Sequence, residues 1–289
     1  VRSAMESLIE DYEHVLSRFR NDSLIAAIGK AEHGGSFDFP DWCAPLFDLY
    51  DALFSATSGA IDPCVGEDLI RLGYDASLSF TVTQDAPEHL GALRGRAVWG
   101  RDVTRHGTTL VTHEPMQLDF GACGKGYLVD LLGRMLQSSQ FVIDAGGDLL
   151  IHAEQPISVA LEDPEDQSHA IGIAHIANGA LCASAPSRRH WNVAVNERTQ
   201  IAIHHLLNAI DGLPAQQTEA SWAYVPANAT LNLARDYPTA VADGLATALF
   251  VSDVAQLQRT FDFTYATLDE SRQIAVSRNF PAELFLRSA

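Results

Sequence analysis

The stretch LDFGACGKGYLVD, residues 118–130, joins a short apolar run to a helical pattern through three glycines. From Lys125 onward, apolar side chains recur at helical spacing to about residue 138. We therefore predict a short strand, a glycine-rich bend and a helix with Lys125 near its first turn. Such a bend exposes backbone N–H groups, and a helix N-terminus favours an anion. The segment is a candidate phosphate site; the alternative is a tight strand-to-helix turn with a solvated lysine.

Lys125 is unusual in this chain, because only one other lysine, Lys30, stands beside seventeen arginines. An ammonium group at the bend would supply a point charge for a phosphate. The spacing is not that of a P-loop, since Gly126 follows the lysine where a serine or threonine would be needed.

Towards the C-terminus, the stretch VADGLATALF, residues 241–250, places Asp243 and Thr247 four residues apart. On a helix this spacing projects both side chains from one face. A carboxylate and a hydroxyl are hard oxygen ligands that suit Mg²⁺. The alternative is a buried aspartate that accepts hydrogen bonds from a neighbouring loop.

Two further segments carry candidate chemistry. In IAIHHLLNAIDGLPA, residues 201–215, an apolar strand leads His204 and His205 into a turn. Neighbouring strand residues face opposite ways, so only one histidine can point at a given site, as a general base or as a half-buried strand residue. In DAGGDLL, residues 144–150, paired glycines permit close approach of a ligand or form an ordinary hairpin.

The rest of the chain mixes helical and strand patterns without strict alternation. This mixture predicts an α+β fold in a single domain, residues 1–289. GKAEHGGSFDFPDW, residues 29–42, is predicted to be a loop. We expect helices at residues 3–20, 46–54, 239–250 and 253–261. We expect strands in 77–83, 108–113, 141–153, 157–164, 172–177, 191–195 and 221–225.

Composition excludes several classes of protein. A net charge of −18 argues against a surface that follows nucleic-acid phosphates or an anionic membrane. No run of eighteen apolar residues occurs, so no transmembrane segment is expected. The four cysteines show no metal-ligand spacing and are predicted to be buried or semi-buried free thiols. No signal peptide is visible, which favours the cytoplasm, with export or membrane anchoring open if the chain is a truncated form.

Taken together, the segments resemble the FAD:protein FMN transferase family of the ApbE type. That family has, in order, the motifs S-x-Y-x-x-x-S, G-G-A-F-D-P, D-L-G-x-x-A-K-G-Y-x-x-D, N-x-G-G-D, H-I-I-D-P-x-T-G-x-P and A-D-A-L-A-T-A. The matching stretches follow the same order between residues 17 and 250: SRFRNDS (17–23), TSGAIDP (57–63), LDFGACGKGYLVD, DAGGDLL, HHLLNAIDGLP (204–214) and VADGLATA (241–248).

The resemblance implies a flavin-nucleotide cleft and Mg²⁺-dependent transfer of FMN from FAD to a threonine or serine of an acceptor protein, with release of AMP. By position, the catalytic residues would be His205 and Lys125. The cofactor contacts would be Phe19, Ala60, Ile61, Asp62, Asp119, Lys125 and Leu206. The metal would be held by Ala122, Asp243 and Thr247, with Ala246 beside them.

The chain departs from the family pattern at several positions. Asn208 and Ala209 replace the aspartate and proline of the histidine motif, Asp211 replaces its threonine, and Gly29 replaces an asparagine after the first motif. The expected strand before the first helix is also missing from the sequence. Three alternatives stay open: an FAD pyrophosphatase, a flavin-binding protein without catalysis, and a protein that binds another nucleotide.

Overall fold

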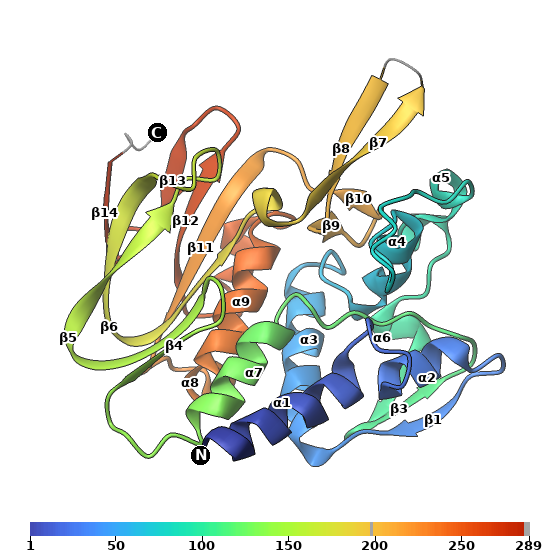
Figure 1. The fold of residues 1–289 in the computed structure, drawn as a ribbon, viewed down its shortest axis with the longest axis horizontal. Helices are drawn as coiled ribbons and strands as arrows, with labels where there is room; N and C mark the ends of the chain where they lie inside the picture. The colour runs from blue at the N-terminus through green and yellow to red at the C-terminus, as the bar shows by residue number, and fades with distance from the viewer. Residues whose placement is uncertain (197–198, 286–289) are drawn as a thin grey trace. The chain divides into compact units, whose positions relative to one another are not determined.

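The computed structural model describes residues 1–196 and 199–285. The chain forms two compact units, which we treat separately. The sheet unit contains residues 122–188 and 216–289, with Val1; the helical unit contains residues 2–121 and 189–215. Figure 1 labels the elements of both units.

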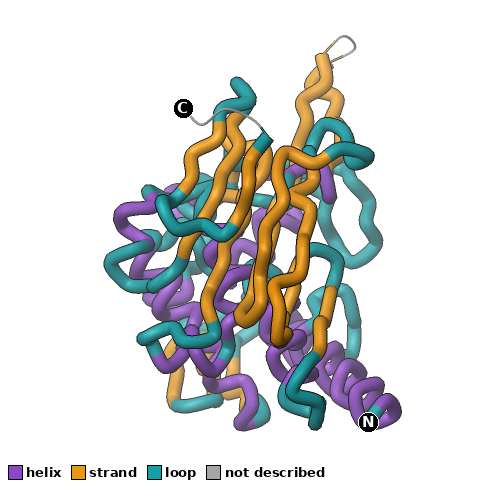
Figure 2. The backbone as a smooth tube through the Cα atoms, turned by 90° about the vertical axis from the view of Figure 1, so that its left-hand side faces the viewer, coloured by secondary structure: helices purple, strands orange, loops and turns teal. Residues whose placement is uncertain are grey.

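The sheet unit is built on a seven-stranded sheet in which every described pairing is antiparallel. The strand order is β13-β12-β11-β6-β5-β4, and β14 pairs with β6. Figure 2 shows these strands side by side. Their bounds are β4 Phe141–Asp144, β5 Asp148–Glu162, β6 Ala170–Ser184, β11 Thr218–Pro226, β12 Thr264–Asp269, β13 Ile274–Val276 and β14 Ala282–Leu284.

Two helices of the sheet unit carry most of the candidate chemistry. They are α7, Gly124–Gly133, and α9, Pro238–Ala248, and they pack against each other and against the sheet. Almost every residue of α9 is buried. The remaining helices are short: η4 Pro186–Arg188, α8 Asn232–Asp236 and α10 Val254–Leu257.

Close packing between α7 and α9 depends on a glycine and a buried carboxylate. A Cβ at Gly126 would lie 2.4 Å from the carbonyl oxygen of Thr239, so only glycine allows this approach. Four residues later, the Asp130 carboxylate accepts the N–H groups of Thr239 at 3.1 Å and Ala240 at 2.8 Å. Asp130 therefore caps the N-terminal end of α9 from the neighbouring helix.

The helical unit has short strands between its helices. Its helices are α1 Arg2–Leu16, α2 Leu24–Lys30, η1 Asp41–Cys43, α3 Ala44–Ala56, η2 Pro63–Val65, α4 Gly66–Arg71, α5 Ala86–His89, η3 Ala92–Arg94 and α6 Trp99–Asp102. Its strands are β1 Gly35–Asp38, β2 Thr104–His106, β3 Thr109–Thr112, β7 His190–Asn196, β8 Thr199–His204, β9 Leu207–Asn208 and β10 Leu213–Pro214.

Most predicted elements are confirmed, and the α+β class with them. The strand–glycine turn–strand unit becomes β4 and β5, and the predicted helices near residues 46, 125, 239 and 253 all form, although the one near residue 125 ends at Gly133. All four cysteines are buried, and these described residues form no disulfide. The single-domain assignment stays a prediction. Among the described helices, none has the length and apolar character needed to cross a bilayer.

Four local predictions were wrong. The short strand predicted before the glycine-rich bend does not form, since residues 115–120 have no regular secondary structure. Helix α1 ends at Leu16, four residues earlier than predicted, so Phe19 lies outside it. Part of the predicted loop 29–42 pairs as β1 with β3. Residues 77–83 are irregular where a strand was predicted, because Leu78 and Phe80 adopt φ of 53° and 50° in the left-handed region. The alternation of apolar residues there reflects exposed side chains and not a sheet face.

Replacing Asp130 with alanine should lower the free energy of unfolding by roughly 2–4 kcal/mol, because two buried N–H groups lose their acceptor. Urea denaturation measures the change. Asp236→Ala, at an exposed carboxylate that ends α8, is the control and should change stability by less than about 0.5 kcal/mol. Equal effects of the two substitutions would contradict the capping role.

The same carboxyl group should also link stability to pH. Burial raises the pKa of Asp130 to about 7 although two N–H groups oppose this shift. Its contribution to stability is therefore fully present below the unfolded pKa of about 3.9 and is lost as pH rises through about 7. Asp130→Asn should remove this part of the decline between pH 4 and 7, as measured by denaturation at several pH values.

Candidate functional site

In the sheet unit, the proposed metal residues of α9 face the beginning of α7. The Asp243 carboxylate accepts the N–H of Gly126 at 2.9 Å through Oδ2. One turn later, the Thr247 hydroxyl lies 3.4 Å from the carbonyl oxygen of Ala122, to which it donates. The structure thus brings the Asp243 and Thr247 side chains to the bend that carries Ala122, as the i, i+4 spacing predicted.

Ala246, the fourth residue of the predicted set, is oriented differently. Its side chain is completely buried, and its carbonyl oxygen accepts the Ser221 hydroxyl at 2.6 Å. The described contacts therefore tie Ala246 to strand β11, and its place in the metal set rests on its position next to Thr247.

Lys125 is held by a carboxylate that the sequence analysis did not select. Its Nζ lies 2.5 Å from Oδ2 of Asp148, whose side chain is completely buried, while the lysine side chain is 48% exposed. Asp148 follows the glycine pair of DAGGDLL at the start of β5. An acidic residue directly after paired glycines, before an apolar strand, was the signal that could have identified it.

The charges of this cluster do not balance. Burial raises the pKa of Asp243 well above its usual value, and the neighbouring Asp148 adds to the rise while Lys125 opposes it. Burial likewise raises the pKa of Asp148 against the effect of Lys125. Burial disfavours the charged form of Lys125, but the two carboxylates outweigh it and raise the lysine pKa. Two buried carboxylates thus share one ammonium group.

This donor set fits a hard divalent cation. A carboxylate, a hydroxyl and a backbone carbonyl are oxygen ligands of the kind Mg²⁺ prefers, and a cation would offset the surplus negative charge. Among the described residues, no three His, Cys, Asp or Glu side chains form a group that could hold a metal ion. A metal here would therefore depend on the Ala122 carbonyl and the Thr247 hydroxyl as well as on Asp243.

In the helical unit, Asp119 is already engaged by the protein. Its Oδ2 pairs with Nε of Arg18, and its Oδ1 accepts the Gly121 N–H at 2.6 Å. Arg18 in turn lies beside Phe19, a large apolar residue that is 43% exposed. Phe19 and Asp119, which lie a hundred residues apart in the sequence, are therefore brought together through Arg18.

The two histidines of the strand–turn segment have separate surroundings. Nε2 of His204 lies 2.8 Å from the carbonyl oxygen of Ala215. Nδ1 of His205 lies 3.1 Å from the carbonyl oxygen of Arg189, so Nδ1 carries the proton and Nε2 is left as an acceptor. Burial lowers the pKa of His205 to about 4, which keeps the ring neutral near pH 7. Leu206 is buried.

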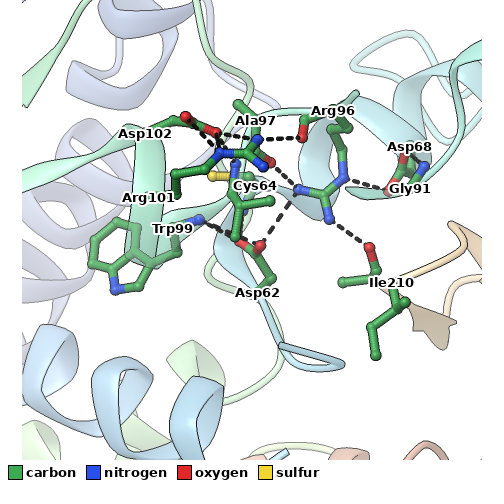
Figure 3. Close-up of polar contacts among 12 residues, drawn as sticks. Asp62, Cys64, Asp68, Gly91, Arg96, Ala97, Trp99, Arg101, Asp102 and Ile210 are labelled. Carbon is green, nitrogen blue, oxygen red and sulfur yellow. Dashed lines mark hydrogen bonds and ion pairs between the residues drawn. The ribbon is translucent and has the colours of Figure 1, made fainter. Parts of the chain in front are cut away.

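Asp62 lies at the centre of a buried polar network, shown in Figure 3. Its carboxylate accepts the N–H groups of Cys64 at 2.8 Å and Trp99 at 3.3 Å, and it lies 3.6 Å from Arg96. Arg96 also pairs with Asp68 at 2.7 Å, and all three charged side chains are almost fully buried. Burial raises the pKa of Asp62, and Arg96 opposes this rise.

This network shows what the TSGAIDP motif does locally. Ala60 and Ile61 are buried together with Asp62, and Ile61 donates its N–H to the Thr57 hydroxyl at 3.0 Å. Arg96 and Asp68 were missed by sequence reasoning, because neither belongs to one of the quoted motifs and Arg96 also lies far from Asp62 in the sequence. These three predicted cofactor contacts thus form a loop whose carboxylate accepts hydrogen bonds from the protein itself.

The departures from the family motifs have local explanations. The Gln117 carboxamide fills the space beside Gly29, since a Cβ at Gly29 would lie 2.7 Å from its Nε2. The Asn208 side chain accepts the Ile210 N–H at 3.0 Å, and its carbonyl accepts the Gly212 N–H at 2.7 Å. Asparagine therefore makes the turn that an aspartate at this position could also make.

Replacing Lys125 with methionine should leave Asp148 as an unpaired buried carboxylate beside Asp243. We expect a loss of roughly 1–3 kcal/mol, smaller than for a fully buried pair because the lysine is half exposed. The loss should be largest near neutral pH and shrink on acidification, since the raised Asp148 pKa lets the group protonate. Urea denaturation at two pH values measures both effects.

The double variant Lys125→Met/Asp148→Asn should recover part of the lost stability, because the uncompensated charge is removed. Lys30→Met is the matched control, because Lys30 is the other lysine of the chain. Its side chain is exposed, and among the described contacts its Nζ donates only to the Asn21 carbonyl. Strictly additive single effects in this cycle would show that Lys125 and Asp148 do not interact.

Comparisons with known proteins concern the family and the fold of the chain. The chain is 27% identical over 285 aligned residues to the FAD:protein FMN transferase of Treponema pallidum (strain Nichols), with 87% of this chain and 72% of that protein covered. The fold is similar to that of the ApbE protein of Thermotoga maritima, with a TM-score of 0.78 at 20% identity over 98% of this chain and 92% of that one.

The flavin transferase ApbE of Vibrio cholerae gives a TM-score of 0.75 at 18% identity and covers 96% of this chain and 88% of that one. At these identities the two solved structures support the fold alone. The sequence match is broader, because the model of the ApbE family matches residues 1–267 of the 289. By that match, the chain belongs to the ApbE family.

Proposed function

We propose that this protein transfers the FMN moiety of FAD to a serine or threonine hydroxyl of an acceptor protein and releases AMP, with Mg²⁺ as its metal. Membership of the ApbE family and the name of the Treponema pallidum relative support this function. The observation that carries it is the cluster of Ala122, Asp243 and Thr247 oxygens beside an incompletely neutralised pair of carboxylates.

Within this proposal, Asp243, Thr247 and the Ala122 carbonyl hold the metal. When bound, Mg²⁺ would neutralise charge on the pyrophosphate oxygens of FAD as the bond to AMP breaks. Ala246 keeps α9 close to β11 and belongs to the set by its position next to Thr247. The hard oxygen donors and the surplus negative charge support Mg²⁺ over a softer metal.

Lys125 contributes a second positive charge. One of its three N–H donors is taken by Asp148, and the half-exposed side chain leaves the others for a phosphate oxygen. Because Asp148 is buried and fixed at the start of β5, it restrains where the ammonium group can lie. We assign Lys125 to charge stabilisation and Asp148 to positioning of Lys125.

His205 is proposed to accept the proton of the acceptor hydroxyl. The Arg189 carbonyl fixes its tautomer, so the lone pair on Nε2 is available to take that proton. As the hydroxyl oxygen bonds to the FMN phosphorus, the bond from phosphorus to the AMP oxygen breaks and AMP leaves. The neutral ring, with its lowered pKa, is in the form that a base requires at neutral pH.

The flavin nucleotide contacts are proposed in the helical unit. The partly exposed ring of Phe19 offers a stacking surface for the flavin. Asp119 would contribute indirectly, by pairing with the Arg18 side chain that contacts Phe19. Ala60, Ile61 and Asp62 would contribute as a fixed loop, with the Asp62 carboxylate holding the backbone in place. Leu206 would contribute apolar surface next to His205.

The decisive experiment incubates the full chain with FAD, Mg²⁺ and a candidate acceptor protein. Intact mass should show FMN added to the acceptor, and chromatography should show an equal amount of AMP. Asp243→Asn and Thr247→Val should each abolish both products and weaken Mn²⁺ binding in calorimetry, whereas Asp236→Asn on the exposed α8 should leave both unchanged.

Three other outcomes would contradict the proposed transfer or its metal site. Equal amounts of free FMN and AMP without acceptor labelling would identify an FAD pyrophosphatase. Bound but intact FAD would identify a non-catalytic flavin-binding protein. Undiminished products with the Asp243 and Thr247 variants, or with chelator present, would contradict the metal site.

A separate prediction concerns the base. His205→Asn should reduce transfer roughly 10²–10⁴-fold while FAD binding is retained, because proton acceptance is lost. With a pKa of about 4, His205 is neutral above roughly pH 5, so kcat/KM should fall only as pH drops through about 4. That acid limb should be absent in the variant.

His204→Asn is the matched control, since His204 bonds the Ala215 carbonyl and we place it outside the reaction. It should reduce stability and leave the transfer rate unchanged. A larger loss of transfer in His204→Asn than in His205→Asn would reverse the assignment of the two histidines.

A further inference from the structure

Within the described part of the chain, one donor nitrogen of Arg18 has no hydrogen-bond partner. The Arg18 side chain is only 6% exposed. Nε pairs with Asp119 and Nη1 donates to the Tyr74 carbonyl at 2.6 Å. Nη2 is buried and makes no hydrogen bond among the described residues. A buried guanidinium N–H without an acceptor costs free energy, so the site is incomplete as the protein alone presents it.

Aromatic rings fix the plane of this guanidinium. The Arg18 Cζ lies 4.2 Å from the centre of the Phe19 ring and 4.6 Å from that of Tyr74. Tyr74 is itself stacked on Trp191 at 5.8 Å, and the Trp191 indole N–H donates to the Leu72 carbonyl at 3.0 Å. The Tyr74 ring therefore contacts both the Arg18 guanidinium and the Trp191 ring.

Phe19 is 43% exposed. Besides the Arg18 guanidinium, its ring contacts the Tyr74 ring edge-on at 5.4 Å. The Phe19 ring lies on the Arg18 guanidinium, and the residue is partly open to solvent. A planar ligand that stacks on Phe19 would therefore lie next to the Arg18 side chain that this ring already contacts.

The local charge indicates which acceptor would suit Nη2. Arg18 and Asp119 form an ion pair with almost no exposure to water, so their net charge is zero. A phosphate prefers an uncompensated cation, whereas a neutral carbonyl oxygen in a planar ring suits a neutralised guanidinium among aromatic side chains. The pyrimidinedione end of a flavin ring presents such carbonyl groups.

We propose that Arg18 is a specificity-determining residue for the flavin ring: its Nη2 donates to a ring carbonyl of a flavin stacked on Phe19, and Asp119 positions it. This inference rests on the proposed function, because it assumes that FAD is the ligand. It assigns Asp119 an indirect role, since both of its oxygens are already engaged by Arg18 and Gly121.

Equilibrium binding without Mg²⁺ tests this assignment with three probes: FAD, riboflavin and ADP. Arg18→Met should weaken FAD and riboflavin roughly tenfold to a hundredfold and leave ADP unchanged, because only the flavin ring loses a donor. The absorption spectrum of bound riboflavin should shift towards that of the free flavin. Asp119→Asn should weaken the same two ligands by a smaller factor.

Arg20→Met is the matched control, because Arg20 lies two residues away and pairs with Glu10 and Asp22 at the surface. It should leave all three ligands unaffected. If Arg18→Met lowers the melting temperature severely, Arg18→Lys and Asp119→Asn take its place. The readout is then the ratio of riboflavin to ADP affinity, which a general folding defect would not change selectively.

Each outcome has a distinct meaning. A parallel loss of ADP and FAD binding would assign Arg18 to the phosphates and overturn the proposal. Unchanged riboflavin binding in both Arg18 variants would also overturn it and leave a bound water as the acceptor. If the unaltered protein binds ADP but no flavin, the proposed function fails as well, so the two failures are distinguishable.

Discussion

The contact between α7 and α9 at Gly126 is the constraint on which the rest of the sheet unit depends. Because a Cβ would collide with the Thr239 carbonyl, only glycine lets the two helices approach this closely. The same approach lets Gly126 donate its N–H to Asp243 and lets Thr247 reach the Ala122 carbonyl. One missing side chain therefore makes both the helix packing and the candidate metal site possible.

Close packing also explains the unusual electrostatics of that region. Asp243 and Asp148 lose their hydration on burial, yet Lys125 is the one ammonium group that faces both of them. A protein that gained only stability from this arrangement would do better with apolar side chains. The surplus negative charge is instead consistent with the proposed binding of a divalent cation, which offsets the desolvation of the carboxylates.

The helical unit uses its ion pairs differently. Arg96 is shared between Asp62 and Asp68, and its Nε lies 2.7 Å from Oδ2 of Asp68 although these two buried atoms form no hydrogen bond. The pair of Arg18 and Asp119 is also largely buried, but Nη2 of Arg18 has no acceptor in the part of the chain that the structure describes. The donors of Arg96 that lack a hydrogen bond still lie beside a carboxylate, whereas the free donor of Arg18 has no such neighbour among the described residues, and this difference motivates the proposed ligand contact.

The sequence by itself determined the α+β class, the helix of Asp243 and Thr247, and the glycine bend before Lys125, because helical spacing and glycine content are local properties. It failed at residues 77–83, where alternating apolar residues adopt left-handed backbone angles, and at Phe19, which lies beyond the end of α1. Only the tertiary structure paired Lys125 with Asp148 and Arg18 with Asp119. Each pair joins residues from different segments of the chain. A local sequence pattern does not show which oppositely charged side chains will meet in the folded protein.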